Sequence, residues 1–350
     1  MDKENIITMQ KELSELIGLP GYEDDVANYI IEKIKDKVDK VWIDPLGNIL
    51  AEKTGIKGEN RILLDAHTDE VGFMITHVQA DGFLRFALLG GFDNRIFLGK
   101  SVKIRANDGK YYDGVIGSTP PHLLSASERA KPAEIEDLYI DIGMFSKADV
   151  ESLNITMGST GVMYDPFVEF PNNMIRGKAF DDRTGCNILI NIIDLFKDKE
   201  IEDTLLFSFS VQEEVGGRGA SAAAFSLDPT LAIAVENTTA ADVPGVLEKD
   251  CPVVVGKGPS ITIADNSMIS NPQVNRRLIE NAENIPFQMK KPKFGGTNAG
   301  KIHMVRHGIP STVVSVPCRY IHSSVSLLKI DDVINAIKLL EAFILNKKAI

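Results

Sequence analysis

Seven ionisable side chains in this sequence stand where a metal-dependent reaction could be built. Each one follows a short apolar run or opens a helical pattern, and together they are His67, Asp69, Asp181, Glu213, Glu214, Glu236 and His322. Imidazoles and carboxylates without clustered thiolates form a ligand set that suits zinc, cobalt or manganese. Two such ions about 4 Å apart, joined by a bridging carboxylate and a water, make a hydrolytic centre. The residue types therefore favour a dinuclear metal site.

The elements that must position these residues alternate between strand and helix patterns. Apolar runs typical of buried strands occur at 61–65, 204–211, 231–235 and 311–316, and helical spacing occurs at 6–18, 23–38, 185–197, 271–283 and 330–346. This alternation predicts an α/β fold with a mostly parallel sheet flanked by helices. Because such sheets place their sites at the carboxyl ends of strands, we expect His67, Glu214 and Glu236 at one edge.

The stretch from residue 70 to residue 162 has a different pattern. Short alternating segments are separated by turn pairs such as Asp81-Gly82 and Asp108-Gly109, and long helical patterns are few. Such segments are typical of β-hairpins. We therefore expect a β-rich insert at 70–162 that interrupts one discontinuous unit made of 1–69 and 163–350.

Composition and charge exclude several classes of protein. The 350 residues are 44% hydrophobic and 25% charged, which is the balance of a soluble globular protein. A net charge of −11 without a Lys/Arg-rich block argues against nucleic acid as a partner. The N-terminus lacks a signal-peptide pattern, no apolar stretch could cross a bilayer, and the three cysteines are widely spaced. We expect a cytoplasmic protein without a membrane partner.

Several of the candidate residues also have a purely structural interpretation. The Asp181-Asp182 pair could cap a helix, whose first turn favours acidic side chains. Glu213 and Glu214 could lie in a solvated loop, and Glu236 could be an ordinary carboxylate at a strand end. The metal-site hypothesis therefore rests on the convergence of all seven residues.

Six motifs resemble those of the tetrahedral aminopeptidase family, which includes glutamyl aminopeptidases and proteins labelled endoglucanase M. In the family's order they are AHTDEVG at 66–72, GKAFDDR at 177–183, VQEEVGGRGA at 211–220, GKGPSI at 256–261, GGTNAG at 295–300 and CRYIHS at 318–323. The resemblance spans nearly the whole chain. It implies a metallopeptidase catalytic domain at 1–69 and 163–350, interrupted by a small β-barrel dimerisation domain at 70–162. It also implies homo-oligomers, dimers that assemble into a dodecamer, acting on peptide substrates.

The resemblance also implies a role for each candidate residue. Two residues would hold each metal and one carboxylate would bridge the ions: His67 and Glu236 on one side, Glu214 and His322 on the other, and Asp181 between them. Glu213 would be the general base, and Asp69 would orient His67. The two divalent ions, zinc first and cobalt or manganese as alternatives, would activate a water for attack on the first peptide bond.

Two positions depart from the family's usual pattern. Residue 236 is Glu where the family usually has Asp, and residue 298 is Asn where the run usually reads Gly-Gly-Thr-Asp-Ala-Gly. These departures leave open a catalytically weakened descendant that binds peptides or serves as a scaffold. A glycoside hydrolase, suggested by the endoglucanase label, would need two carboxyls roughly 5–10 Å apart and no metal. That alternative would leave Asp181 and His322 without a purpose.

Overall fold

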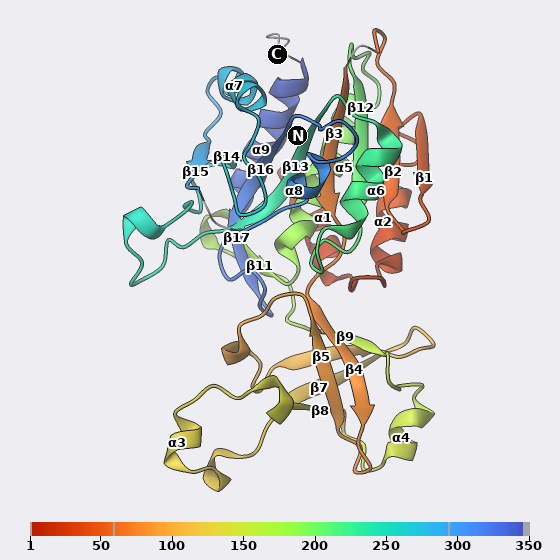
Figure 1. The fold of residues 1–350 in the computed structure, drawn as a ribbon, viewed down its shortest axis with the longest axis vertical. Helices are drawn as coiled ribbons and strands as arrows, with labels where there is room; N and C mark the ends of the chain where they lie inside the picture. The colour runs from red at the N-terminus through yellow and green to blue at the C-terminus, as the bar shows by residue number, and fades with distance from the viewer. Residues whose placement is uncertain (1, 59, 293–294, 346–350) are drawn as a thin grey trace.

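A computed structural model describes residues 2–58, 60–292 and 295–345 of the chain. Two parts lie one above the other along the long axis of Figure 1, an upper α/β part and a lower β-barrel. The predicted fold class, an α/β protein with an inserted small barrel, is confirmed.

Eight strands form the sheet of the α/β part. In spatial order they are β1 (Lys40–Ile43), β2 (Ile49–Lys53), β12 (Thr204–Ser210), β3 (Arg61–His67), β13 (Leu231–Thr239), β16 (Ser311–Cys318), β14 (Ser260–Thr262) and β15 (Gln288–Lys290). The central strands β12, β3, β13 and β16 are parallel to one another. Antiparallel pairs flank this centre, since β2 runs against β12 and β14 runs against β16. The sheet is therefore mixed, with the predicted parallel strands in the middle.

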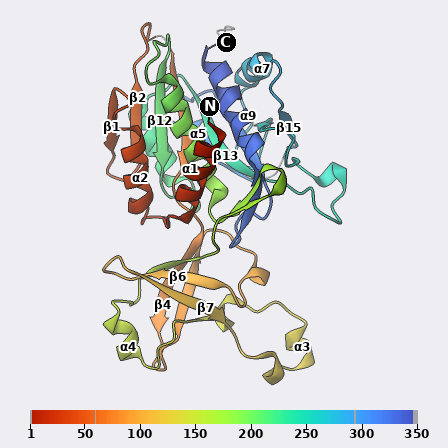
Figure 2. The ribbon, with the colours of Figure 1, turned by 180° about the vertical axis from the view of Figure 1, so that it is seen from behind.

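Helices cover both faces of this sheet and make three layers (Figures 1 and 2). One face carries α1 (Lys3–Glu15), α2 (Asp24–Ile34), α5 (Phe180–Phe196), α7 (Pro272–Asn281) and α9 (Ile330–Leu345), and the other carries α6 (Arg218–Leu227) and α8 (Ala299–Ile302). Along β3, Ile62 and Leu64 pack into the first layer, whereas Leu63 packs into the second. This period of two is that of a strand buried on both faces.

Side-chain caps explain where several helices begin. The Asp2 side chain accepts a hydrogen bond from the Glu4 N–H at the start of α1. Asn271 does the same for two N–H groups of α7, which has Pro272 in its first turn. Both devices satisfy donors that a helix start leaves free, and proline already has the helical φ.

Six antiparallel strands close the lower barrel in the order β4-β5-β8-β7-β6-β9. They are β4 (Gly72–Val78), β5 (Leu84–Leu89), β6 (Ser101–Arg105), β7 (Tyr111–Gly117), β8 (Tyr139–Asp141) and β9 (Thr160–Met163), with the short helices α3 (Ala126–Arg129) and α4 (Lys147–Ser152) on the connections. The barrel has its own apolar core, which includes Phe73, Phe97 and Ile104. Closure of the sheet removes its free strand edges.

A second, three-stranded sheet was not predicted from the sequence. It contains β10 (Val168–Phe170), β11 (Met174–Gly177) and β17 (Ser326–Lys329), with β11 in the middle. Gly177 pairs with Ser326 in this sheet, so the segment leading to Asp181 lies beside the segment that follows His322. The small sheet thus brings together two parts of the site that are far apart in the sequence.

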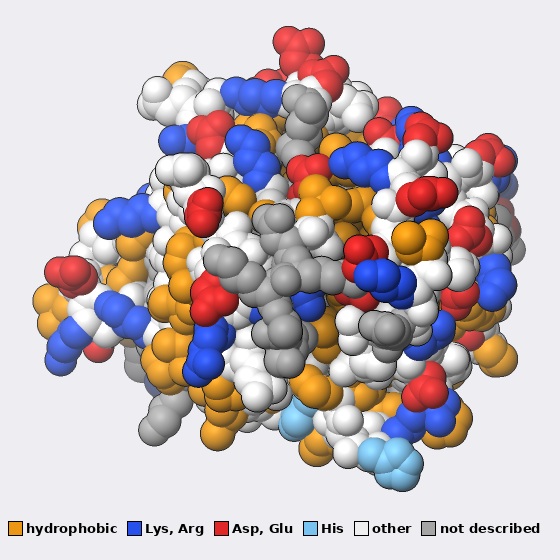
Figure 3. Space-filling view, turned by 90° about the horizontal axis from the view of Figure 1, so that it is seen from above, with side chains coloured by type: hydrophobic (Ala, Val, Ile, Leu, Met, Phe, Trp, Pro, Cys, Tyr) orange, Lys and Arg blue, Asp and Glu red, His pale blue; other side chains and the backbone are white. Residues whose placement is uncertain are grey.

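The surface seen from above carries both signs of charge. Lys and Arg side chains are interspersed with Asp and Glu on this face and form no continuous basic area there (Figure 3). Within the described ranges, no helix is both long enough and apolar enough to cross a membrane.

Candidate metal centre

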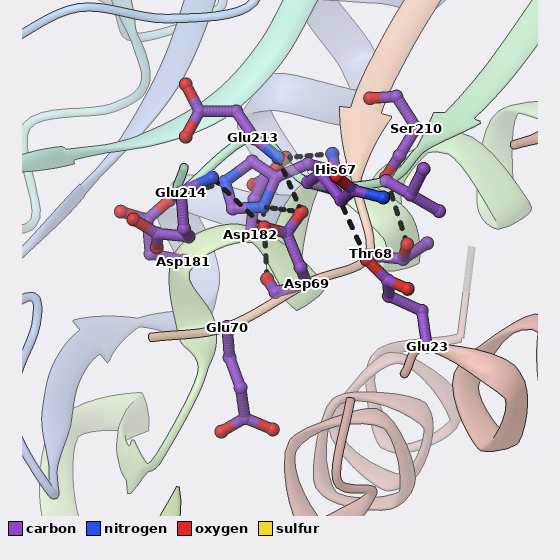
Figure 4. Close-up of polar contacts among 12 residues, drawn as sticks. Glu23, His67, Thr68, Asp69, Glu70, Asp181, Asp182, Ser210, Glu213 and Glu214 are labelled. Atoms are coloured by element: carbon purple, nitrogen blue, oxygen red, sulfur yellow. Dashed lines mark hydrogen bonds and ion pairs between the residues drawn. The ribbon is translucent and has the colours of Figure 1, made fainter. Parts of the chain in front are cut away.

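The carboxyl ends of the parallel strands converge on a partly buried cluster of acids and imidazoles, of which Figure 4 labels His67, Asp69, Asp181, Asp182, Glu213 and Glu214. The cluster contains every predicted site residue: His67 at the end of β3, Asp69 just after it, Glu213 and Glu214 after β12, Glu236 within β13, His322 after β16, and Asp181 at the start of α5. Parallel strands place residues that are distant in sequence at one edge of the sheet.

Asp181 lies between the two imidazoles. Its Oδ1 is 3.4 Å from His67 Nε2, and its Oδ2 is 3.5 Å from His322 Nε2. A second carboxylate also lies near the Nε2 of each imidazole. Glu236 Oε2 is 3.7 Å from His67 Nε2, and Glu214 Oε2 is 3.2 Å from His322 Nε2. Asp181 thus faces two separate imidazole–carboxylate pairs, one with each oxygen.

The donor atoms of this cluster fit divalent cations. The donors of His67, Asp181 and Glu214 lie within 4.8 Å of one another, and so do those of His67, Asp182 and Glu236. Glu214 Oε1 is buried and has no hydrogen-bond partner among the described residues. An unpaired buried carboxylate oxygen is costly unless a donor or a cation satisfies it. Oxygen and imidazole donors of this kind suit zinc, cobalt and manganese.

Burial and like charges perturb the pKa values of these groups. Burial raises the pKa of Glu213 to about 8 and the pKa of Glu236 well above its usual range, and neighbouring carboxylates add to both effects. For His322, burial favours a lower pKa, but the hydrogen bonds that its ring donates to Asp181 and Glu214 outweigh it and raise the pKa to about 11. The cluster therefore carries an excess of acidic groups that bound cations would compensate.

Asp69 organises the loop that carries the two glutamates. Its Oδ1 accepts a hydrogen bond from the Glu213 N–H at 2.9 Å, and its Oδ2 accepts one from the Glu214 N–H at 3.0 Å. Asp69 also lies behind His67, with its backbone carbonyl 3.0 Å and its Oδ1 3.5 Å from His67 Nδ1. The family resemblance implied the contact with His67, whereas the anchoring of Glu213 and Glu214 was not predicted.

Asp182 joins the cluster without having been assigned a site role from the sequence. It is linked to Asp181 by a cis peptide bond. Its Oδ2 accepts the His67 N–H at 3.2 Å, and its Oδ1 accepts the Gly185 N–H at 3.0 Å. The second contact is a helix cap, so the structural interpretation of the Asp pair holds for Asp182. A Cβ at position 185 would lie 2.3 Å from the Val235 carbonyl oxygen, which requires glycine there.

A buried ion network supports the cluster from below. Glu70 Oε1 lies 2.7 Å from Lys178 Nζ and 3.3 Å from a terminal nitrogen of Arg183. The Lys178 ammonium also donates to the Leu16 carbonyl, and the Arg183 Nε donates to the Thr68 carbonyl. These contacts tie the motif at 66–72 to the motif at 177–183 and to the end of α1.

The unusual Asn298 has a buried carboxylate as its partner. Its Nδ2 donates to Asp65 Oδ2 at 2.9 Å and to Ser210 Oγ at 2.8 Å, and both Asn298 and Asp65 are fully buried. The Asn298 N–H also points at Glu236 Oε1, at 3.4 Å. The side chain at position 298 therefore donates a hydrogen bond to a carboxylate instead of providing one. The carboxylate of this pair belongs to Asp65.

Comparison with known proteins identifies the class and then the family. An aminopeptidase structure from the archaeon Desulfurococcus kamchatkensis matches with a TM-score of 0.94 and 36% identity, covering 99% of this chain and 96% of that one. The chain is thus a peptide hydrolase. The model of the M42 glutamyl aminopeptidase family matches residues 47–339, and the chain belongs to this family. The resemblance to tetrahedral aminopeptidases is confirmed.

Other relatives are also named aminopeptidases, but their names give different N-terminal residues as the one removed. A glutamyl aminopeptidase from Lactococcus lactis is 32% identical, with 95% of this chain and 94% of the relative covered. A lysyl aminopeptidase from Pyrococcus furiosus is 31% identical, with 96% of each covered. The Pyrococcus horikoshii TET1 peptidase, described as assembling into a tetrahedron or a large octahedral shell, matches with a TM-score of 0.88 and 34% identity, covering 98% of this chain and all of that one.

Proposed function

We propose that this chain is a metal-dependent aminopeptidase with two divalent ions at the cluster. The observation that carries the proposal is the position of Asp181, whose two oxygens face different imidazoles at 3.4 and 3.5 Å. His67 and Glu236 would hold one ion, Glu214 and His322 would hold the other, and Asp181 would contact both. Bound ions of this kind lower the pKa of a water and polarise a carbonyl oxygen. Zinc is the first candidate, and cobalt or manganese would accept the same donors.

Glu213 would serve as the general base. It lines the same cavity as His67 and His322, and its carboxylate is not among those placed nearest the imidazoles. Burial and neighbouring carboxylates raise the pKa of Glu213 in the metal-free site, and bound cations would lower it again, so that the carboxylate could accept a proton near neutral pH. Glu213 would take a proton from the attacking water and return it to the leaving amine. Asp69 would keep Glu213 in place, because it holds the Glu213 N–H.

The excess of carboxylates would also select the N-terminus of a peptide. A free α-amine is attracted to a buried acidic cluster, whereas an acetylated amine carries no charge and adds bulk. Cleavage would therefore be confined to the first peptide bond. Acetylation of the substrate is expected to abolish hydrolysis.

The test is the Glu213→Gln variant, assayed on aminoacyl-nitroanilides together with its metal content. General acid–base catalysis contributes about 10²- to 10⁴-fold, so turnover should fall by that factor. The metal content should stay at two ions per chain, since Glu213 is not a proposed ligand. The exposed Glu32→Gln variant, whose partner is Lys35, serves as the matched control. Undiminished turnover in Glu213→Gln would refute this mechanism.

We further propose that 1–69 and 163–350 form the catalytic domain and that the insert at 70–162 is a dimerisation domain. The barrel part exposes large apolar side chains, including Leu123 and Phe145. Such groups favour association with another copy. The dodecamer and the tetrahedral shell described for TET1 structures support a homo-oligomer, in which dimers would assemble further into a dodecamer. Light scattering should then show an oligomer, and a monomer at micromolar concentration would contradict this assignment.

A further inference from the structure

A cavity of about 200 Å³ opens beside the cluster and contains one lysine. Its lining includes Glu213, Glu236 and His322 from the cluster, together with Lys290. Lys290 is the last residue of β15, an edge strand, and its side chain is 2% exposed. Among the described lining residues, it is the one Lys or Arg.

The Lys290 ammonium has no partner of its own in the described part of the chain. Unlike Lys178, which lies 2.7 Å from Glu70, it makes no hydrogen bond there and no ion pair within 4.0 Å. A buried charge without a close partner is costly, and protein interiors pair such groups almost without exception. The missing partner is therefore expected to come from a ligand.

The surrounding charges do not provide a dedicated partner. Burial lowers the pKa of Lys290, while the more distant Asp265, Glu236 and Asp181 act in the opposite direction. Glu236 and Asp181 belong to the proposed metal centre. Asp265 Oδ1 already accepts hydrogen bonds from the Ser267 N–H and hydroxyl and from the Met268 N–H. Asp265 Oδ2 has no hydrogen-bond partner among the described residues, but it forms no ion pair with the Lys290 ammonium within 4.0 Å. Lys290 is thus left facing the cavity as an uncommitted cation.

We propose that Lys290 binds the side-chain carboxylate of an acidic N-terminal residue, so that the enzyme prefers peptides beginning with Asp or Glu. This inference rests on the proposed aminopeptidase function. The wall beside the ammonium is glycine, and even a Cβ at Gly295 would stay 3.9 Å from Lys290 Nζ, which leaves room for a carboxylate. A lysine side chain in the substrate would meet a like charge there, which disfavours it. Of the two specificities named for the relatives, glutamyl and lysyl, the cavity would therefore favour the acidic one.

The proposal is tested with the metal-loaded enzyme on glutamyl-, leucyl- and lysyl-nitroanilide. The wild type should have its highest kcat/KM on the glutamyl substrate. Loss of a hydrogen bond between charged groups is expected to lower that kcat/KM by about 10- to 100-fold in Lys290→Gln. The leucyl substrate has no side-chain carboxylate to pair with Lys290, so its kcat/KM should change by less than about threefold in that variant. Lys290→Arg should keep the preference, and Lys257→Gln, which removes an exposed lysine outside the cavity lining, should resemble the wild type.

Binding without turnover provides an independent readout. Calorimetry on metal-loaded Glu213→Gln should show L-glutamate binding more tightly than L-glutamine, and Lys290→Gln should remove that difference. A wild type that prefers the leucyl or lysyl substrate would overturn the proposal, as would a glutamyl preference that survives Lys290→Gln. An effect confined to dipeptides with a free C-terminal carboxylate would also overturn it, since Lys290 would then bind the other end of the substrate. Inactivity on all three nitroanilides would count against the aminopeptidase function instead, and the glutamate titration would still test Lys290.

Discussion

Replacing Asn298 by Asp should destabilise this chain, although Asp is the residue usual in the family at this position. Asn298 Nδ2 donates to Asp65 Oδ2 at 2.9 Å, and neither residue is exposed to solvent. The Asn298→Asp change would replace this donor by a second acceptor. Two carboxylates would then face each other in a buried site, next to the Ser210 hydroxyl.

The size of the effect follows from these contacts. Breaking a buried pair so that a charge is left uncompensated costs about 3–5 kcal/mol. A loss of 1 kcal/mol shifts the Tm of a domain of 150–250 residues by about 2–4 °C. We therefore expect the Tm of Asn298→Asp to fall by roughly 6–20 °C.

The assay is a double-mutant cycle measured by thermal and denaturant unfolding. The reciprocal exchange Asp65→Asn with Asn298→Asp restores one amide and one carboxylate across the same hydrogen bond. The double variant should therefore regain at least about 2 kcal/mol relative to the sum of the single changes, within the range found for residues in contact. A stable Asn298→Asp variant, or a double variant less stable than either single one, would refute the reasoning.

Three further outcomes are expected. Loading the metal-free protein with zinc should release protons, because Asp181 and its neighbouring carboxylates raise the pKa of His67 and, to about 11, that of His322. Both imidazoles are then protonated at neutral pH, so zinc affinity should rise with pH. Heats of zinc binding that are the same in buffers of different ionisation enthalpy would contradict the release of protons. His322→Ala should lower the zinc content from two ions per chain to one, measured by elemental analysis, and a content of two would remove His322 from the ligand set. Glu70→Gln should cost about 3–5 kcal/mol of unfolding free energy, because it leaves Lys178 buried without its counter-ion. Glu32→Gln, at an exposed ion pair, should cost about 1 kcal/mol or less. Similar losses in the two variants would show that burial does not determine how much an ion pair contributes to stability.

The sequence predicts the parts of the fold that obey local rules. The run at 61–65 corresponds to β3 (Arg61–His67), and the helical spacing at 330–346 corresponds to α9 (Ile330–Leu345). The turn pairs Asp81-Gly82 and Asp108-Gly109 do connect neighbouring barrel strands. Strand ends then indicate which polar residues share an edge, because parallel strands end together.

Contacts between distant segments were beyond such rules. The hydrogen bond between Asn298 and Asp65 joins residues 233 positions apart, and the anchoring of the Glu213 N–H by Asp69 spans 144 positions. The edge strands β14 and β15 have three residues each, too few to show a direction or a neighbour. The capping role of Asp182 was predicted from the acidic pair at 181–182, but its contact with the His67 N–H, 115 positions away, was not. The ligand and base assignments themselves remain predictions.

The central claim, metal-dependent aminopeptidase activity, is tested most directly by hydrolysis of a panel of aminoacyl-nitroanilides. The protein is first stripped with a chelator and then supplied with zinc, cobalt or manganese. We expect no turnover after stripping, recovery with at least one of these ions, and no cleavage of N-acetylated substrates. Turnover that persists in the stripped protein, or silence across the panel when two ions per chain are bound, would contradict it.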